Sequence, residues 1–189
     1  PYAKEIFGLT PEMIEFYSKI TGVDYPWNKY AQITVRDYVS GAMENTTATL
    51  HGEFENQTHR QMLDVYYDFG ASTIAHELFH QWFGDYVTCE SWSNLTVNES
   101  FANYSETLWA EHKYGPDVAA DQNNQDMQAY LNDPTAATKN LVRFHYADKE
   151  DVFDNVTYQK GGRILGMLRN YLGNDAFYKG LNIYLKTNA

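Results

Sequence analysis

The clearest pattern in the chain is a stripe of apolar residues near its middle. The stripe recurs at intervals of three and four residues, which is typical of a helix with one buried face. Its members are Ala75, Leu78, Phe79 and Trp82. Ser72 suits the start of such a helix and Gly84 its end, so the pattern predicts a helix over 72–83.

Five further helices are predicted from periodicity and from the residues at their ends. The first begins at Thr10-Pro11, where threonine suits the cap and proline the first turn, and Gly22 ends it. The others make the second half of the chain mostly helical. The five expected spans are 10–20, 97–114, 117–131, 155–172 and 175–186.

Extended structure is expected only in the first third of the chain. Residues 31–39 alternate and are rich in β-branched side chains, which predicts a strand. Residues 41–50 are expected as a second extended segment, and 51–69 as a polar, irregular connection. The fold is therefore expected to be α+β and mostly α, with a short β portion followed by a helical body and no internal domain boundary.

Composition and charge narrow the class of protein. The 189 residues are 43% hydrophobic and 16% aromatic, which is enough for the packed core of one domain. The net charge of −11 argues against a nucleic-acid partner, which requires clustered Lys and Arg. No apolar run reaches the length of a membrane span, so no membrane segment is expected in this chain. The sequence indicates no cellular compartment.

The central helix carries a metal-binding pattern. His76-Glu77-Leu78-Phe79-His80 is an H-E-x-x-H sequence. Residues four apart differ by about 40° around a helix, so both imidazoles project from one side and can bind one ion. Glu77 is rotated by about 100° from His76, where it can act on a water beside the ion without binding the ion.

A hydrolytic zinc site uses three protein ligands and leaves one position for water. Glu99 is the expected third ligand, because it lies on the next predicted helix with eighteen residues between it and His80. Asn103 and Glu106 share its helix face and are candidates for hydrogen bonds to the imidazoles. The prediction is one zinc ion per chain. In the alternative, both histidines are ordinary side chains of a half-buried helix that need other polar partners.

The other histidines and the single cysteine show no ligand spacing. The histidines are expected at the surface, and they are His51, His59, His112 and His145. Cys89 excludes an internal disulfide and is expected to be a spectator thiol. It would be the obvious fourth ligand of a structural zinc module, but no spacing supports that reading.

Three motifs, taken together, resemble the aminopeptidase N family of gluzincin metallopeptidases. Gly41-Ala42-Met43-Glu44-Asn45 is similar to that family's exopeptidase signature. The H-E-x-x-H sequence with Glu99 has the family's spacing, and Tyr158-Gln159-Lys160-Gly161 is similar to its tyrosine motif. The motifs follow the family's order, and the resemblance implies a thermolysin-like zincin catalytic domain.

The resemblance also implies an activity. Glu44 would bind the free N-terminal amine of a peptide, and Tyr158 would donate to the developing oxyanion. With Glu77 as the catalytic base, the expected reaction is zinc-dependent hydrolysis of the N-terminal peptide bond. The expected substrate-binding segment comprises Gly41, Ala42, Met43, Glu44 and Asn45.

Two rival functions stay open, and one expectation concerns the length of the chain. A thermolysin-like endopeptidase would share the metal site without needing Glu44, and a non-catalytic scaffold would need neither Glu77 nor Tyr158. The family has a β domain before this region and a helical domain after it. The chain, which begins with Pro1 rather than Met, is expected to be a partial catalytic domain that works poorly without the flanking domains of the same protein.

Overall fold

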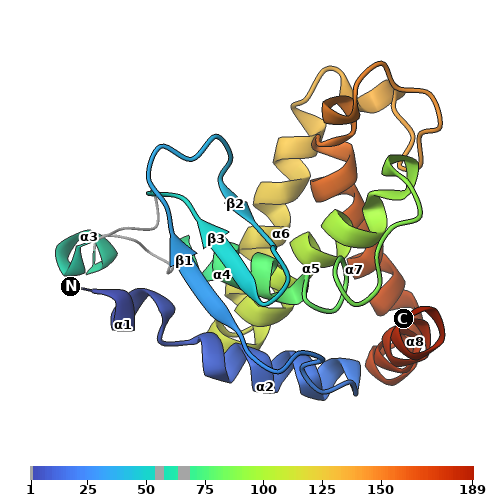
Figure 1. Cartoon of the computed structure of the whole chain (residues 1–189). Helices are drawn as coiled ribbons and strands as arrows, with labels where there is room; N and C mark the ends of the chain where they lie inside the picture. The colour runs from blue at the N-terminus through green and yellow to red at the C-terminus, as the bar shows by residue number, and fades with distance from the viewer. Residues whose placement is uncertain (1, 54–57, 64–68) are drawn as a thin grey trace.

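A three-stranded sheet lies at one side of a body of helices (Figure 1). This computed structural model describes residues 2–53, 58–63 and 69–189. The arrangement confirms an α+β fold that is mostly α, with a short β portion that follows α1 and α2 and precedes the rest of the helical body. Within the described residues, no helix is long and apolar enough to cross a membrane.

The sheet is smaller than the sequence predicts. Its strands are β1 (Ala31–Thr34), β2 (Ala42–Met43) and β3 (Ala48–His51), in the order β1-β3-β2. β1 runs parallel to β3, and β2 runs antiparallel to it. The segment predicted as one extended stretch is two strands, because a turn closed by a hydrogen bond from Ala48 N to Asn45 O at 2.8 Å reverses the chain between them.

His51 corrects the expectation that the spare histidines lie at the surface. It ends the central strand and is fully buried, with Nε2 at 2.9 Å from the Thr49 hydroxyl and its ring edge-on to Phe7. The prediction was wrong because spacing along the chain does not reveal that helix α1 (Ala3–Phe7) covers this strand. The other three are exposed, as predicted: His59, His112 and His145.

The first helices differ in part from the prediction. α2 (Thr10–Thr21) matches the expected span, and Gly22 follows it in the left-handed conformation with φ of 60°. α1 was not predicted, and neither was α3 (His59–Leu63), which lies in the connection expected to be irregular. Parts of that connection, residues 54–57 and 64–68, lie outside the described residues.

The core forms around the central helix α4 (Phe69–Phe79). All four residues of the predicted apolar stripe are at most 1% exposed and pack against α2 and α5 (Thr96–Tyr114). α4 begins three residues earlier than predicted. After His80 the chain tightens into turns, as in the hydrogen bond from Gln81 N to Leu78 O at 3.0 Å, so the helix ends before the predicted residue 83.

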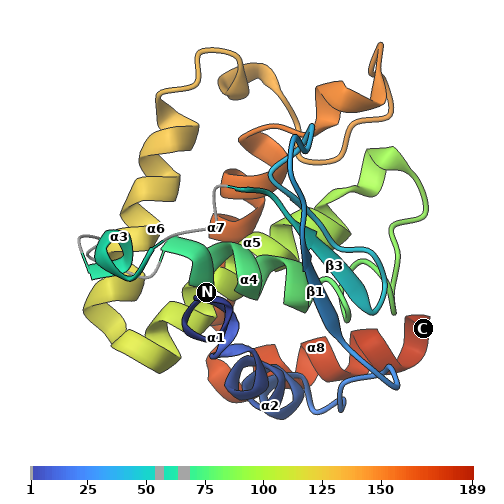
Figure 2. The same cartoon turned by 60° about the vertical axis from the view of Figure 1, so that its left-hand side comes forward.

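The remaining elements complete the helical body. α6 (Pro116–Leu131) and α8 (Asn174–Asn188) follow the prediction closely, and α8 lies beside α2 (Figure 2). The helix predicted over 155–172 is divided into a π-helical turn, η5 (Val156–Lys160), and α7 (Gly161–Leu172). Short 3₁₀ turns that lie wholly within the described residues include η2 (Trp92–Asn94), η3 (Ala136–Thr138) and η4 (Lys149–Val152).

Candidate metal and peptide site

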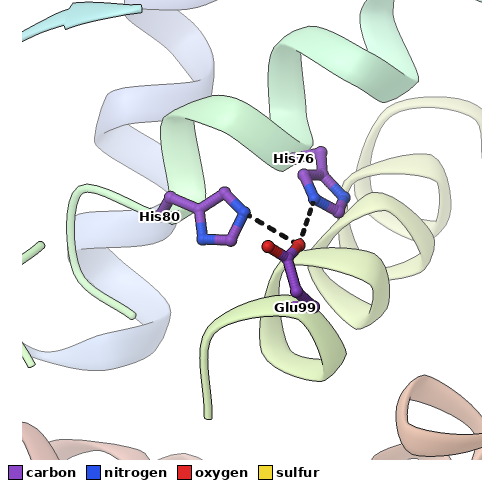
Figure 3. Close-up of side chains that lie close together, drawn as sticks. All are labelled: His76, His80 and Glu99. Carbon is purple, nitrogen blue, oxygen red and sulfur yellow. Dashed lines mark hydrogen bonds and ion pairs between the residues drawn. The ribbon is translucent and has the colours of Figure 1, made fainter. Parts of the chain in front are cut away.

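Two imidazoles and one carboxylate converge between α4 and α5 (Figure 3). The Nε2 atoms of His76 and His80 lie 3.2 Å and 3.3 Å from the same oxygen of Glu99, Oε2. His80 and Glu99 are buried, and the His76 side chain is 12% exposed. One ligand atom from each residue lies within 4.8 Å of the others, a grouping that could hold a metal ion.

The second nitrogen of each ring faces its own acceptor. His76 Nδ1 lies 2.8 Å from Glu106 Oε1, and His80 Nδ1 lies 2.9 Å from the carbonyl oxygen of Phe83. A proton on each Nδ1 would leave the Nε2 lone pairs directed at the space beside Glu99. Two imidazole nitrogens and one carboxylate oxygen suit zinc and leave a coordination position open.

Glu106 and Asn103 were predicted together, but they lie in different surroundings. The second oxygen of Glu106 accepts hydrogen bonds from the Ser72 hydroxyl at 2.6 Å and from Gln122 at 3.3 Å. Asn103 is buried against α7, where a Cβ on Gly162 would meet its Oδ1 at 2.1 Å. The acceptor facing His80 is a backbone carbonyl instead, which a sequence motif cannot reveal.

Glu77 lies next to the triad of candidate metal ligands, His76, His80 and Glu99, without belonging to it. It is 7% exposed, and its Oε2 has no hydrogen-bond partner among the described residues. Burial raises the pKa of Glu77 to about 7, although the two imidazoles act in the opposite direction. A carboxylate with a pKa near neutrality is suited to accept and return a proton.

Glu44 reaches the same place from the turn between β2 and β3. Ligand atoms of Glu44, Glu77 and His80 lie within 4.8 Å of one another. The turn is held by Gln81, which is fully buried, donates to the Glu44 carbonyl at 3.0 Å and accepts from Thr47 N at 2.8 Å. Gln81 was not predicted as a site residue, and its only signal in the sequence is its position directly after His80.

Tyr158 lies on η5 and contacts the candidate ligand His76. Its ring stacks on His76, with the centroids 5.9 Å apart and the planes 16° from parallel. Burial, followed by the charge of Glu99, raises the pKa of Tyr158 above its ordinary value of 10.0. The phenol therefore keeps its proton at neutral pH and can donate a hydrogen bond.

These groups share one cleft of about 880 Å³. Among the predicted site residues, those lining it are Gly41, Ala42, Met43, Glu44, His76, Glu77, His80, Glu99, Glu106 and Tyr158. Asn45 is exposed on the adjoining turn. Cys89, Trp92 and Phe153 also line the cleft, and none of them was predicted as a site residue. The rings of Trp92 and Phe153 have their centroids 5.8 Å apart.

Sequence comparison identifies relatives over nearly the whole chain. The pattern of the peptidase family M1 domain matches residues 6–189. Aminopeptidase N of Streptomyces lividans is 35% identical over 195 residues, which cover 99% of this chain and 22% of that protein. Aminopeptidase M1 of Arabidopsis thaliana is 31% identical over 189 residues, covering 93% and 20%. The chain thus spans only 20–22% of the length of these two curated relatives.

Solved structures share the fold. Yeast LTA4 hydrolase in complex with bestatin matches with a TM-score of 0.80 and 26% identity, over 95% of this chain and 29% of that one. An M1 zinc metallopeptidase from Deinococcus radiodurans, bound to a Tyr-Ser-Ala substrate, matches with a TM-score of 0.74 and 28% identity, over 95% and 36%. The sequence match, the shared fold and the expected motifs agree, and the chain belongs to peptidase family M1.

Proposed function

We propose that this chain is the catalytic domain of a zinc-dependent aminopeptidase, which removes the N-terminal residue of peptides. The observation that carries the proposal is the grouping of Glu44 with Glu77 and His80 inside the cleft. A carboxylate facing an ammonium in a partly dry cleft forms a charge-assisted hydrogen bond. A peptide amine bound at Glu44 would bring the first peptide bond, rather than a later one, beside Glu77.

The metal would be one zinc ion held by His76, His80 and Glu99. Three protein ligands are typical of catalytic zinc, whereas structural sites have four. When bound, zinc lowers the pKa of its water and polarises a carbonyl group. The related structure described as an M1 zinc metallopeptidase supports the choice of metal.

The residues of the chain itself would have three separate roles: proton transfer, stabilisation of the oxyanion and orientation of the histidine rings. Glu77 takes the proton of the attacking water and passes it to the leaving amine, a role that its pKa of about 7 supports. The Tyr158 phenol donates to the oxygen on which negative charge develops. Glu106 holds the ring of His76, and the Phe83 carbonyl holds the ring of His80.

The substrates would be peptides with a free N-terminal amine. The chain's share of its relatives' length is compatible with the expected flanking domains of the same protein, which stay a prediction. The glycine and alanine of the 41–45 segment would lie along the bound peptide, next to the amine site.

Mass spectrometry of peptide products tests the proposal. Incubation of the zinc-loaded chain with an unmodified decapeptide should remove residues one at a time from the N-terminus, while the N-acetylated peptide stays intact. Internal fragments from both peptides would favour the endopeptidase. No cleavage by a chain with full zinc content would favour the non-catalytic scaffold.

A further inference from the structure

The turn that carries Tyr158 is seated directly on the helix that carries Glu99. The carbonyl oxygen of Thr157 accepts a hydrogen bond of 2.6 Å from the hydroxyl of Ser100. The contact is close enough that a Cβ on Gly161 would meet the Ser100 hydroxyl at 1.9 Å. Small changes in the backbone of η5 would therefore move the Tyr158 ring relative to the triad.

One guanidinium holds this turn from outside the cleft. Arg143, whose side chain is 11% exposed, donates from Nη1 and Nη2 to the two oxygens of Asp154 at 2.7 Å and 2.9 Å. Nη2 also donates to the Thr157 hydroxyl at 2.7 Å. Arg143 thus binds Asp154, two residues before η5, and Thr157, the residue next to Tyr158.

Asp154 links Arg143 to the backbone of the turn by further hydrogen bonds. Its Oδ1 accepts from the backbone N–H groups of Val156 at 3.1 Å and Thr157 at 3.2 Å, and its carbonyl accepts from Tyr158 N at 3.1 Å. Lys139 adds a contact of 2.8 Å to Oδ2. Both oxygens of the carboxylate are therefore engaged. Among its partners in the described part of the chain, the guanidinium is the one that also donates to the side chain of Thr157.

We propose that Arg143 is a positioning residue for Tyr158. Its planar fork fixes Asp154 and Thr157 together, and this sets where the phenol points. Arg143 is not among the described residues that line the cleft, so it would act through the segments it holds. Besides the turn, these include the end of η4, where the carbonyl oxygens of Asp151 and Val152 accept from the guanidinium at 3.3 Å and 3.2 Å. Only an effect that passes through the turn should depend on Tyr158. A lysine offers a single point of charge and cannot reproduce the three contacts. The inference rests on the role of Tyr158 in the proposed function.

A double-mutant cycle with Arg143→Lys and Tyr158→Phe tests this role. A small misplacement of a catalytic group costs up to about 10²-fold in rate, and we expect Arg143→Lys to lower kcat by about tenfold while KM stays within about twofold. In the Tyr158→Phe background, the same change should lower kcat by less than about twofold, because the group being positioned is gone. Zinc content should be equal in all four proteins.

Arg169→Lys is the matched control. Its guanidinium is 14% exposed, binds both oxygens of Glu111 on α5 and lies away from the described lining of the cleft. It should change thermal stability as Arg143→Lys does, and leave kcat at the wild-type value. A loss of kcat equal to that of Arg143→Lys would reduce the effect to general destabilisation and overturn the proposal.

Two other results would also overturn it: wild-type kcat in Arg143→Lys, or an equal tenfold loss in both backgrounds. If Arg143→Lys does not fold, Thr157→Val serves instead, because it removes the hydroxyl that accepts the hydrogen bond from Nη2. It should lower kcat in the wild-type background and not in the Tyr158→Phe background. If Tyr158→Phe alone keeps wild-type turnover, the role of Tyr158 in the proposed function fails. A slowed Tyr158→Phe beside an unchanged Arg143→Lys refutes the positioning role only.

Discussion

Replacing Glu106 should weaken zinc binding although Glu106 is not a proposed ligand. Its Oε1 lies 2.8 Å from His76 Nδ1, and its other oxygen accepts from Ser72 and Gln122. Without the carboxylate, the Nδ1 of a ring that is only 12% exposed loses its acceptor, and the tautomer that directs Nε2 at the metal loses its support.

The structure sets an order for three variants. Glu106→Ala removes the acceptor and its charge, and should weaken zinc binding by about 10²-fold, the upper end for such partners. Glu106→Gln keeps one acceptor oxygen and should cost about tenfold, or about 1.4 kcal/mol. Ser72→Ala acts only on the oxygen that faces away from His76, and its effect should be smaller than that of Glu106→Gln.

Zinc affinity is measured by competition with a chelator at one fixed pH, because metal binding releases protons. Glu111→Ala is the control: Glu111 lies on the same helix, and its carboxylate pairs with Arg169 instead of a histidine. It should leave zinc affinity within about twofold of wild type. Equal losses in Glu106→Ala and Glu111→Ala, or wild-type affinity in Glu106→Ala, would refute the claim that Glu106 orients His76.

Three further predictions concern the proposed proton carrier and the residues on either side of Tyr158. Glu77→Gln should keep one zinc per chain and lose about 10²–10⁴-fold in turnover, because the amide cannot carry the proton. Metal analysis together with kinetics checks this prediction. Near-normal turnover would remove Glu77 from the mechanism. Burial opposes the ionised form of Asp154, but the bonds from Arg143 and Lys139 outweigh it and lower its pKa from 3.8 to about 2. The stabilisation is therefore complete above the ordinary pKa of Asp154 and is lost as the pH falls towards 2. Urea titrations would give the free energy of unfolding of the wild type and of Asp154→Asn, and the difference between them should be constant above about pH 5 and shrink below about pH 4. A difference that does not change with pH would contradict this reasoning. Gly161→Ala places a Cβ against Ser100 and should destabilise the chain by about 1–3 kcal/mol, and an unchanged midpoint of unfolding would show that the contact relaxes freely.

The convergence of His76, His80 and Glu99 could be predicted because its geometry is mostly local. The apolar stripe fixes how α4 is rotated in the core, so the neighbouring face that carries His76 and His80 turns towards α5. A carboxylate on the next helix then needs only an antiparallel return, which places Glu99 opposite both imidazoles. Helical spacing alone places the two imidazoles on one side, and the return of the next helix supplies the carboxylate.

The parts that the sequence did not reveal depend on chain reversals and on long-range contacts. The acceptor for His80 is the carbonyl of Phe83, and it exists only because the chain tightens into a turn after α4. Gln81, in the turn directly after α4, contacts the turn of Glu44, which lies 37 residues earlier in the chain. The burial of His51 depends on strand order, and the π-helical turn before α7 has no signature in a periodicity of 3.6 residues.

The most direct test of the aminopeptidase proposal compares kcat/KM for an aminoacyl anilide with a free amine and for its N-acetylated twin. Loss of a charge-assisted hydrogen bond costs about 1.5–3 kcal/mol, so the wild-type chain should prefer the free amine by about 10–150-fold. Glu44→Ala should bring the two substrates within a few-fold of each other, whereas Glu90→Ala, another carboxylate lining the cleft, should keep the preference. Equal hydrolysis of both substrates by the wild-type chain would contradict the proposal that Glu44 binds the N-terminal amine.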